Sequence, residues 1–282
     1  MKNWMKIIIV GVVILLMAQA LAIDASYRIG QYLDDQVVIV HRGGTTERPE
    51  QTLVAYEYAN DQGIKVMECD ARITSDKVFV AMHDDTWDRT TNGSGAIVST
   101  KWNGYGEWLD AGSWFSPEYK GEGVPTMAEL MGWAHNESIL LWIDCYFSGA
   151  FDDEFLELLE DQDMTDRVVL QFMVETKDYL RAERYEDVRI SYRVVLPVQD
   201  MVDSALGWCK EDGVSFMTIP WEMGTGGVYD DATEKGVRIS LYSYNQARTN
   251  ADYIQEFEEG AWGCFTDSVT QATLIQTILD SD

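Results

Sequence analysis

Short apolar runs recur along this chain and alternate with longer amphipathic stretches. The runs span residues 37–40, 66–67, 78–82, 139–143, 168–172, 190–196, 216–219, 237–242 and 264–265. Runs of this kind are typical of buried parallel strands, and the stretches between them have the length of helices. Residues 51–61, between Pro49 and Gly63, and residues 151–161 are predicted as two of these helices. The alternation predicts an α/β fold with a parallel sheet.

The length of the chain indicates one domain. It has 282 residues, close to the ~250 typical of an eight-stranded α/β barrel, and no low-complexity linker or internal repeat divides it. Nine apolar runs are one more than such a barrel needs, so one of them is an extra or split strand. We therefore predict a TIM-type (β/α)8 barrel over residues 36–282.

Polar residues cluster at the ends of the first three runs. His41 and Arg42 follow residues 37–40, Glu68 and Asp70 follow residues 66–67, and His83 follows residues 78–82. Each cluster alone is explained equally well by a strand end, a helix cap or a solvated edge. Together they indicate a site, because the ends of parallel strands converge and buried charges are costly unless paired or bound to metal.

In the Glu68-Cys69-Asp70 segment, the period of two along a strand places both carboxylates on one face and Cys69 on the other. The polar face then offers only oxygen ligands. Hard carboxylate oxygens, with those of the later Asp144, suit Ca²⁺ or Mg²⁺ rather than a soft transition metal. We expect one divalent cation, either Ca²⁺ or Mg²⁺.

These segments and several others resemble the motifs of one known family. In chain order they are His41-Arg42-Gly43, Arg48-Pro49-Glu50-Gln51-Thr52, Glu68-Cys69-Asp70, Thr74-Ser75-Asp76, His83-Asp84-Asp85, Arg89-Thr90-Thr91-Asn92-Gly93, Asp110-Ala111-Gly112-Ser113-Trp114-Phe115, Gly121-Glu122, Val124-Pro125-Thr126, Trp142-Ile143-Asp144, Tyr244-Asn245 and Phe265-Thr266-Asp267. The pattern is similar to that of the glycerophosphodiester phosphodiesterases. The match is specific in the first half of the chain and looser in the second.

The resemblance implies metal-dependent hydrolysis of glycerophosphodiesters to glycerol phosphate and an alcohol. One of His41 and His83 would be the general base, acting on the glycerol 2-hydroxyl or on water, and the other would protonate the leaving alcohol. Arg42 would bind the phosphate through its planar fork, and Glu50 would support the site. Glu68, Asp70 and Asp144 would hold the metal.

The chain departs from the family pattern around Asp144. The family usually has glutamate, one residue, then lysine, where this chain has Asp144-Cys145-Tyr146. Tyr146 shares the strand face of Asp144 and is expected to border the phosphate pocket, with a neutral hydroxyl in place of a charge. Gln51 and Gln171 stand where asparagine and serine are usual.

Residues of about 85–126 break the periodicity and are rich in Gly, Trp and Asn. By resemblance this is an insertion over the barrel mouth after the third strand. A segment of that length in a compact domain is usually functional. Its aromatic residues would either contact the alcohol group of the substrate or pack the insertion onto the barrel. They are Trp102, Trp108, Trp114 and Phe115.

Two other functions stay open at this stage. One is a related phospholipase or lyase acting on intact lipid or on a glycerophosphate polymer. The other is a non-catalytic phosphate-binding module, favoured by Tyr146 and disfavoured by the intact histidines and carboxylates.

The amino terminus predicts the compartment. Lys2 and Lys6 precede an apolar run that ends in the small-residue pattern at residues 20–22. Residues 1–22 are expected to be a cleaved signal peptide or, alternatively, an uncleaved signal-anchor that would be the only membrane contact. The protein is therefore expected to be secreted or extracytoplasmic, or else anchored to the membrane by this segment.

The net charge of the chain limits the kinds of partner that it can bind. Acidic residues number 48 against 21 basic ones, a net charge of −27. Such a field repels nucleic acid and anionic membrane surfaces. The expected partner, a small-molecule phosphodiester, is what the family resemblance implies.

The remaining candidates for chemistry have structural explanations. Cys69, Cys145 and Cys264 lie in or at the end of core runs and Cys209 lies in a helical stretch, so free, buried thiols are expected. His135 lies near the end of an amphipathic segment and is expected at a helix terminus.

Overall fold

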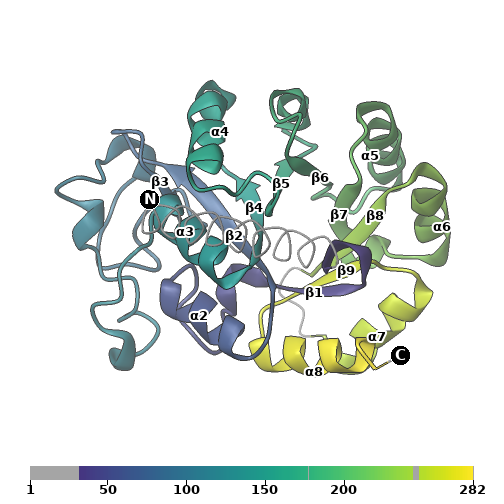
Figure 1. Ribbon diagram of the computed structural model, residues 1–282, viewed down its shortest axis with the longest axis horizontal. Coiled ribbons are helices and arrows are strands. Elements are labelled where there is room, and N and C mark those ends of the chain that lie inside the picture. The colour runs from purple at the N-terminus through teal and green to yellow at the C-terminus, as the bar shows by residue number, and fades with distance from the viewer. Residues whose placement is uncertain (1–31, 177, 244–247, 282) are drawn as a thin grey trace, which may run out of the picture.

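Within residues 32–176, 178–243 and 248–281, which the computed structural model describes, eight parallel strands close into a barrel (Figure 1). They are β1 (Val37–Val40), β2 (Val66–Ile73), β4 (Leu140–Cys145), β5 (Val168–Met173), β6 (Arg189–Arg193), β7 (Phe216–Pro220), β8 (Arg238–Tyr242) and β9 (Gly263–Thr266). Their order around the barrel is β1-β9-β8-β7-β6-β5-β4-β2, and pairing of Val40 with Met67 closes the circle. The predicted TIM-type barrel is confirmed.

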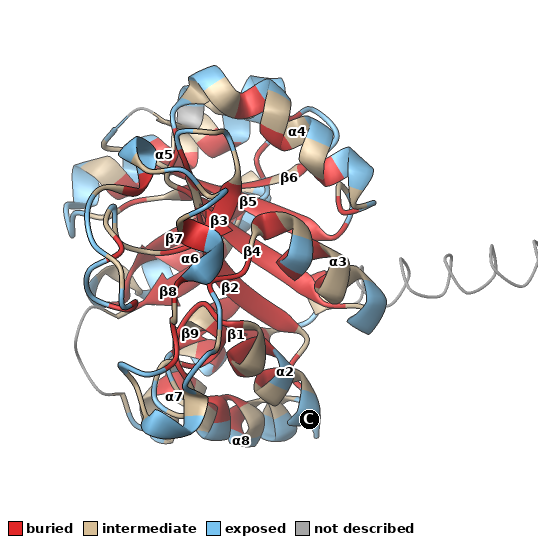
Figure 2. Cartoon of the chain, turned by 90° about the vertical axis from the view of Figure 1, so that its left-hand side faces the viewer, coloured by how far each residue is buried: buried red, intermediate tan, exposed pale blue. Residues whose placement is uncertain are grey.

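Helices ring the outside of the barrel, as Figures 1 and 2 show. They are α2 (Leu53–Asp61), α3 (Met127–Glu137), α4 (Asp152–Asp161), α5 (Gln199–Asp212), α6 (Gly226–Lys235), α7 (Asn250–Glu259) and α8 (Val269–Leu279). The two helices predicted from periodicity, over 51–61 and 151–161, correspond to α2 and α4. The capping hydroxyl of Thr126 accepts a hydrogen bond from the Glu129 amide at the start of α3, which explains why that helix begins there.

The two faces of each strand have different surroundings. Outward residues such as Cys69 and Ile143 pack against the helices, whereas inward residues such as Ile39 and Trp142 fill the barrel interior. Toward the carboxyl ends of the strands, the inward side chains become polar. Asp70 of β2 and Asp144 of β4, for example, lie side by side in register. The apolar interior therefore forms a floor beneath a polar mouth. All four cysteines are free and buried, as predicted.

One expectation about the strands was wrong. β3 (Phe79–Ala81) is antiparallel to β2, pairing Ala71 with Ala81 and Ile73 with Phe79, so it is not a strand of the parallel barrel. β2 extends beyond the barrel mouth, and β3 returns along this extension, where the Met82 amide donates to the Asp70 carbonyl oxygen. Strand β3 is therefore the extra, ninth apolar run. It brings His83 back to the mouth.

The segment after β3 forms loops and three short 3-10 helices, η2 (Ile97–Ser99), η3 (Gly106–Trp108) and η4 (Pro117–Tyr119). It lies at one flank of the barrel, beside β3 and α3 (Figure 1). A small apolar cluster that includes Trp87, Ile97 and Leu109 holds it there, with Trp102 packed against it. The segment is therefore stabilised by its own core.

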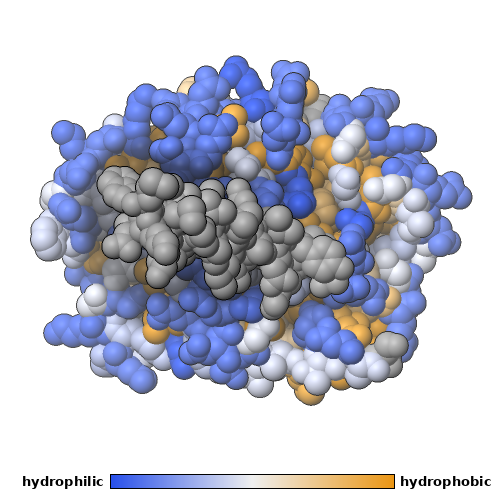
Figure 3. Space-filling model, in the orientation of Figure 1, coloured by the Kyte–Doolittle hydropathy of each residue, from blue (hydrophilic) through white to orange (hydrophobic). Residues whose placement is uncertain are grey.

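Hydrophilic side chains line most of the edge of the face shown in Figure 3, in keeping with the acidic composition. None of the helices in the described residues combines the length and apolarity needed to cross a bilayer. The predicted signal segment, residues 1–22, lies outside the described residues.

Candidate active site

A pocket of about 270 Å³ opens at the carboxyl ends of the barrel strands. The predicted site residues that line it are His41, Arg42, Glu50, Glu68, His83, Asp144 and Tyr146. Asp70 lies directly beneath, within the cluster it forms with Glu68 and Asp144. All eight predicted site residues thus lie together, although they come from separate segments of the chain. This is expected where the carboxyl ends of parallel strands converge.

The turn after β1 positions the first cluster. Arg42 has φ 51° and ψ 33°, a left-handed conformation that turns its backbone amide to donate a 2.9 Å hydrogen bond to Glu68 Oε2. Gly43 follows with φ 78°, and a β-carbon there would lie 2.9 Å from Cβ of Ala55 in α2. Strained backbone of this kind persists where the surrounding structure enforces it, often at functional sites. Helix α2 thus requires the glycine of the His-Arg-Gly motif.

Each motif histidine is held by an aspartate. His41 Nδ1 lies 2.7 Å from Asp267 Oδ1, and His83 Nδ1 lies 2.8 Å from Asp84 Oδ1. A carboxylate only accepts hydrogen bonds, so Nδ1 is the protonated nitrogen in both rings and Nε2 is the nitrogen that exchanges a proton with a ligand. The two imidazoles have the same tautomer and the same mode of support.

Both aspartates are held in the charged form. The hydrogen bond from Arg89 holds the pKa of Asp84 well below its ordinary value, in spite of partial burial. Burial would raise the pKa of Asp267, but its hydrogen bond with His41 and the charge of that ring bring the pKa below the usual value. Each carboxylate can therefore stabilise a neighbouring imidazolium.

Glu50 links two arginines. Arg42 Nη1 donates to Glu50 Oε1 at 3.0 Å, and Arg89 donates to both oxygens of Glu50 at 2.7 and 2.8 Å. Arg89 also reaches Asp84, so the chain of contacts runs from Arg42 to His83. Burial opposes ionisation of Glu50, yet the two guanidinium groups lower its pKa below the ordinary value. Glu50, which the sequence predicted to support the site, is thus a buried and charged carboxylate that links Arg42 to Arg89.

Glu68, Asp70 and Asp144 form a buried group whose ligand atoms all lie within 4.8 Å of one another. Burial, and then the charges of Asp70 and Asp144, raise the pKa of Glu68 well above its usual range. Burial and the charge of Asp70 likewise raise the pKa of Asp144, although Arg193 opposes this. Carboxylates crowded in this way repel one another, and a cation among them would favour their charged forms.

The cluster of Glu68, Asp70 and Asp144 has the ligand atoms that a hard divalent ion prefers. The hydrogen bonds it accepts from Arg42 and Gln51 use Glu68 Oε2 and Asp70 Oδ2, which leaves the second oxygen of each as a ligand. Cys69 lies between them on the outward face, packed in the core, and burial raises the pKa of its thiol well above the usual value. The donor set is therefore oxygen only, as Ca²⁺ and Mg²⁺ prefer.

Tyr146 borders the pocket beside Asp144. Its hydroxyl lies 3.4 Å from Asp144 Oδ2 and 3.3 Å from Nη1 of Arg193. Burial, followed by the charge of Asp144, raises the pKa of Tyr146 far above its usual value, so the hydroxyl stays neutral. Gln171 donates from the neighbouring strand to Asp144 Oδ1.

Sequence reasoning missed four residues of the site. Asp84, Arg89 and Asp267 were part of motifs without an assigned role, whereas Arg193 belonged to no motif. The signal for Arg193 was a charge inside the otherwise apolar run of residues 190–196. A lone charge in a buried strand requires a partner, and that partner is Asp144.

His135 lies outside the site, in the last turn of α3, with Nε2 3.2 Å from Asp163 Oδ2. Its expected place at a helix terminus is confirmed. The described residues that line the pocket include no aromatic residue of the insertion, and Trp108 is 77% exposed. Packing thus explains Trp102, whereas Trp108 contacts mainly solvent.

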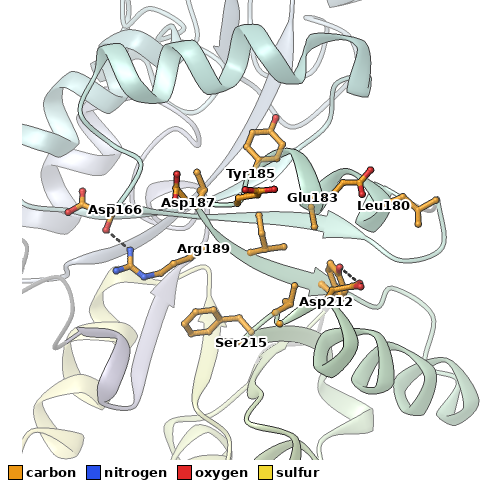
Figure 4. Close-up of a pocket in the computed structure, with 16 residues that line it drawn as sticks. Asp166, Leu180, Glu183, Tyr185, Asp187, Arg189, Asp212 and Ser215 are labelled. Carbon is orange, nitrogen blue, oxygen red and sulfur yellow. Dashed lines mark hydrogen bonds between the residues drawn. The ribbon is translucent and has the colours of Figure 1, made fainter.

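A larger hollow of about 700 Å³ lies at the opposite end of β6, where η6 (Asp178–Arg184) stands between β5 and β6 in place of a longer helix (Figure 4). Acidic residues, among them Asp187 and Asp212, line it. Its arginine, Arg189, donates to the carbonyl oxygen of Asp166. The hollow holds neither motif histidine, and the smaller pocket is the candidate active site.

The chain is similar to known proteins in sequence and in fold. The model of the glycerophosphoryl diester phosphodiesterase family matches residues 41–270. A glycerophosphodiester phosphodiesterase of Bacillus subtilis is 36% identical over 106 residues, which is 35% of this chain and 36% of that protein. The enzyme of the same description from Caldanaerobacter subterraneus is 30% identical over 139 residues, 48% of this chain and 56% of that protein. These alignments span little more than half of the relatives' lengths at most.

Solved structures share the fold over most of the chain. The glycerophosphodiester phosphodiesterase of Agrobacterium tumefaciens superposes with a TM-score of 0.72 and 22% identity, over 85% of this chain and 99% of that one. An Oleispira antarctica phosphodiesterase in complex with the product sn-glycerol-3-phosphate superposes with a TM-score of 0.73 and 23% identity, over 86% and 96% of the chains. At this level of identity the likeness establishes the barrel.

Proposed function

The chain belongs to the glycerophosphoryl diester phosphodiesterase family, and from this premise we propose that it hydrolyses glycerophosphodiesters to glycerol phosphate and an alcohol. The single observation that carries the proposal is the meeting, in one pocket, of two histidines held at Nδ1 by aspartates and a buried group of three carboxylates. Proton transfer and cationic stabilisation are the two requirements of phosphodiester hydrolysis.

His41 and His83 divide the proton transfers. The aspartate on Nδ1 orients each ring, and Nε2 accepts or donates the proton at the reacting oxygens. One ring begins neutral as the base and the other begins protonated as the acid, and the charged aspartates stabilise whichever ring carries the positive charge. Both rings are accessible from the pocket, since the side chains of His41 and His83 are 30% and 36% exposed.

Arg42 binds the phosphate oxygens, and its burial among Glu50, Asp70 and Glu68 holds its guanidinium in place, with the charges of those carboxylates raising its pKa above the ordinary value. Glu68, Asp70 and Asp144 would hold one divalent cation, Ca²⁺ or Mg²⁺. When bound, that cation supplies positive charge to the phosphoryl oxygens as negative charge develops on them.

The experiment that tests the function is a coupled assay for sn-glycerol 3-phosphate released from glycerophosphocholine, run with Ca²⁺, with Mg²⁺ and with chelator. Release of glycerol phosphate is the expected result. Release of a cyclic glycerophosphate as the final product would identify a lyase instead. Binding of glycerophosphocholine without turnover would identify a phosphate-binding module.

Loss of the aspartate on either histidine is expected to reduce turnover. Asp267→Ala and Asp84→Ala should each lower kcat by ~10- to 100-fold, a part of the 10²–10⁴-fold that proton transfer contributes, because the ring loses its orientation and its counter-charge. KM should stay within about threefold, since neither aspartate binds the phosphate.

The matched control for the aspartate variants is Asp163→Ala, which removes the carboxylate from His135 outside the site. It should leave kcat unchanged. Equal losses in Asp163→Ala and Asp267→Ala would indicate a general effect on folding rather than on the histidines, and steady-state kinetics with melting temperatures distinguishes the two.

We also propose that the protein acts outside the cytoplasm, because residues 1–22 have the charge and apolar pattern of a signal peptide. Expression of the full chain in a bacterium, followed by fractionation and intact-mass measurement, is expected to yield a secreted or periplasmic form that begins near residue 23. A full-length form in the membrane fraction would favour the signal-anchor, and a full-length form in the cytoplasm would contradict both.

A further inference from the structure

Arg193 occupies the mouth of the barrel from the wall opposite Arg42. Arg42 follows β1 and Arg193 ends β6, and these strands are four positions apart in either direction around the eight-stranded circle. Both side chains line the pocket, with exposed fractions of 14% for Arg42 and 12% for Arg193. A ligand between the histidines would therefore have an arginine on each side.

Among the described residues, Asp144 in β4, Tyr146 just after β4 and Tyr242 in β8 hold the guanidinium of Arg193. Its Nη1 donates to Asp144 Oδ2 and lies 3.3 Å from the Tyr146 hydroxyl, and its central carbon lies 4.7 Å from the ring centroid of Tyr242. A planar guanidinium that lies over an aromatic ring and donates through Nη1 has a defined direction. The charge is therefore positioned in advance of ligand binding.

The charges around the pocket explain why a second arginine is needed. Four carboxylates, Glu50, Glu68, Asp70 and Asp144, are buried there, and their four negative charges exceed the two positive charges of one divalent cation. Arg42 is shared between Glu50 and Asp70, at 3.0 and 3.2 Å. The inward residue that follows Asp144 on its own chain segment is Tyr146, whose hydroxyl is not a cationic group. The cation in that corner of the pocket comes from β6.

We propose that Arg193 binds the phosphate of the substrate, together with Arg42 from the opposite wall, and that it takes the place of a cation at position 146. The inference rests on the proposed function for the identity of the ligand, a glycerol phosphate ester. Arg193 is then a specificity-determining residue for the phosphate group, and its contact with Asp144 also fixes the orientation of that carboxylate.

The test measures binding of sn-glycerol 3-phosphate by titration calorimetry to the Ca²⁺-loaded protein, alongside kinetics on glycerophosphocholine. Arg193→Gln is expected to weaken binding by ~10- to 100-fold, the range of a lost charge-assisted hydrogen bond. KM should rise to a similar extent while kcat changes by less than about threefold. Arg193→Lys, which retains the charge without the fork, should be intermediate.

The matched control is Arg189→Gln on the same strand. Arg189 lines the hollow at the other end of β6 and donates to the carbonyl oxygen of Asp166 (Figure 4). It should change the affinity for glycerol 3-phosphate by less than about twofold. A rescue variant completes the set: Tyr146→Lys in the Arg193→Gln background puts a charge within a few ångströms of the lost one and should restore most of the affinity.

The outcomes separate this inference from the proposed function. If wild-type protein binds glycerol 3-phosphate and Arg193→Gln does not, the inference holds, whether or not glycerophosphocholine is hydrolysed. If wild-type protein hydrolyses glycerophosphocholine and Arg193→Gln retains both affinity and KM, the inference is wrong and the function stands. A lower melting temperature with unchanged affinity would mean that Arg193 only neutralises Asp144. Should Arg193→Gln fail to fold, equal affinity of Arg193→Lys and wild type would overturn the role of the fork.

Discussion

His41→Ala and His83→Ala are each expected to lower kcat on glycerophosphocholine by at least ~10²-fold, because each removes one of the two proton-transfer groups. Both rings line the pocket and each is held through Nδ1, so each variant removes the Nε2 that faces the ligand. The fold should survive, since both rings are partly exposed and lie outside the apolar clusters. Steady-state kinetics with circular dichroism provides the measurement.

The third histidine is the matched control for these variants. His135 is 34% exposed, almost the same as the other two, and it also lies beside an aspartate, but it lies in the last turn of helix α3, away from the pocket. His135→Ala should leave kcat within about twofold of wild type. A comparable loss in His135→Ala, or full activity in either motif variant, would show that the roles assigned to the histidines are incorrect.

Substitutions in the cluster of Glu68, Asp70 and Asp144 are expected to have the second large effect on kcat. Asp70→Asn and Glu68→Gln keep the size of the side chains but remove ligand charge, and each should lower kcat by ~10²–10³-fold. Charge stabilisation by a bound metal is worth several kcal/mol, and each 1.36 kcal/mol is a factor of ten in rate. Chelator should have a similar effect on wild-type protein, reversed by adding Ca²⁺ or Mg²⁺.

Metal binding itself is measured by titration calorimetry, independently of activity. Wild-type protein is expected to bind one divalent ion, and both variants should bind it at least ~10-fold more weakly because one ligand has lost its charge. Cys69→Ala is the control on the same strand: its side chain is fully buried between barrel and helices, so the ion should bind as in wild type. Full activity in chelator, with the carboxylates only in salt bridges, would contradict a metal-assisted mechanism.

Arg42 and Arg193 differ in how they were found. Arg42 follows a motif histidine directly and could be assigned from the chain alone, whereas the role of Arg193 depends on its reaching Asp144 from a strand 49 residues later. The departure at Tyr146 indicated a missing charge, and only the closed barrel shows where a charge is supplied. In our proposal, the charge that the motif lacks is supplied from a part of the chain that carries no motif.

The sequence by itself determined the features that depend on local periodicity. Apolar runs at regular intervals predicted the barrel, and the period of two in Glu68-Cys69-Asp70 placed two carboxylates inward and one thiol outward, as the structure has them. These features are set by the alternation of side chains along a strand, which a short segment specifies without its neighbours. The same reasoning placed His41 and His83 at the ends of strands.

Only the tertiary structure decided the direction of β3 and the partners of the site residues. An apolar run of three to five residues looks the same whether it pairs parallel or antiparallel, and β3 was assigned the wrong direction for that reason. Asp267 lies 226 residues from His41, and Arg193 lies 49 residues from Asp144. Such pairs are fixed by closure of the barrel, which brings strand ends together whatever their separation along the chain, so no local pattern contains them.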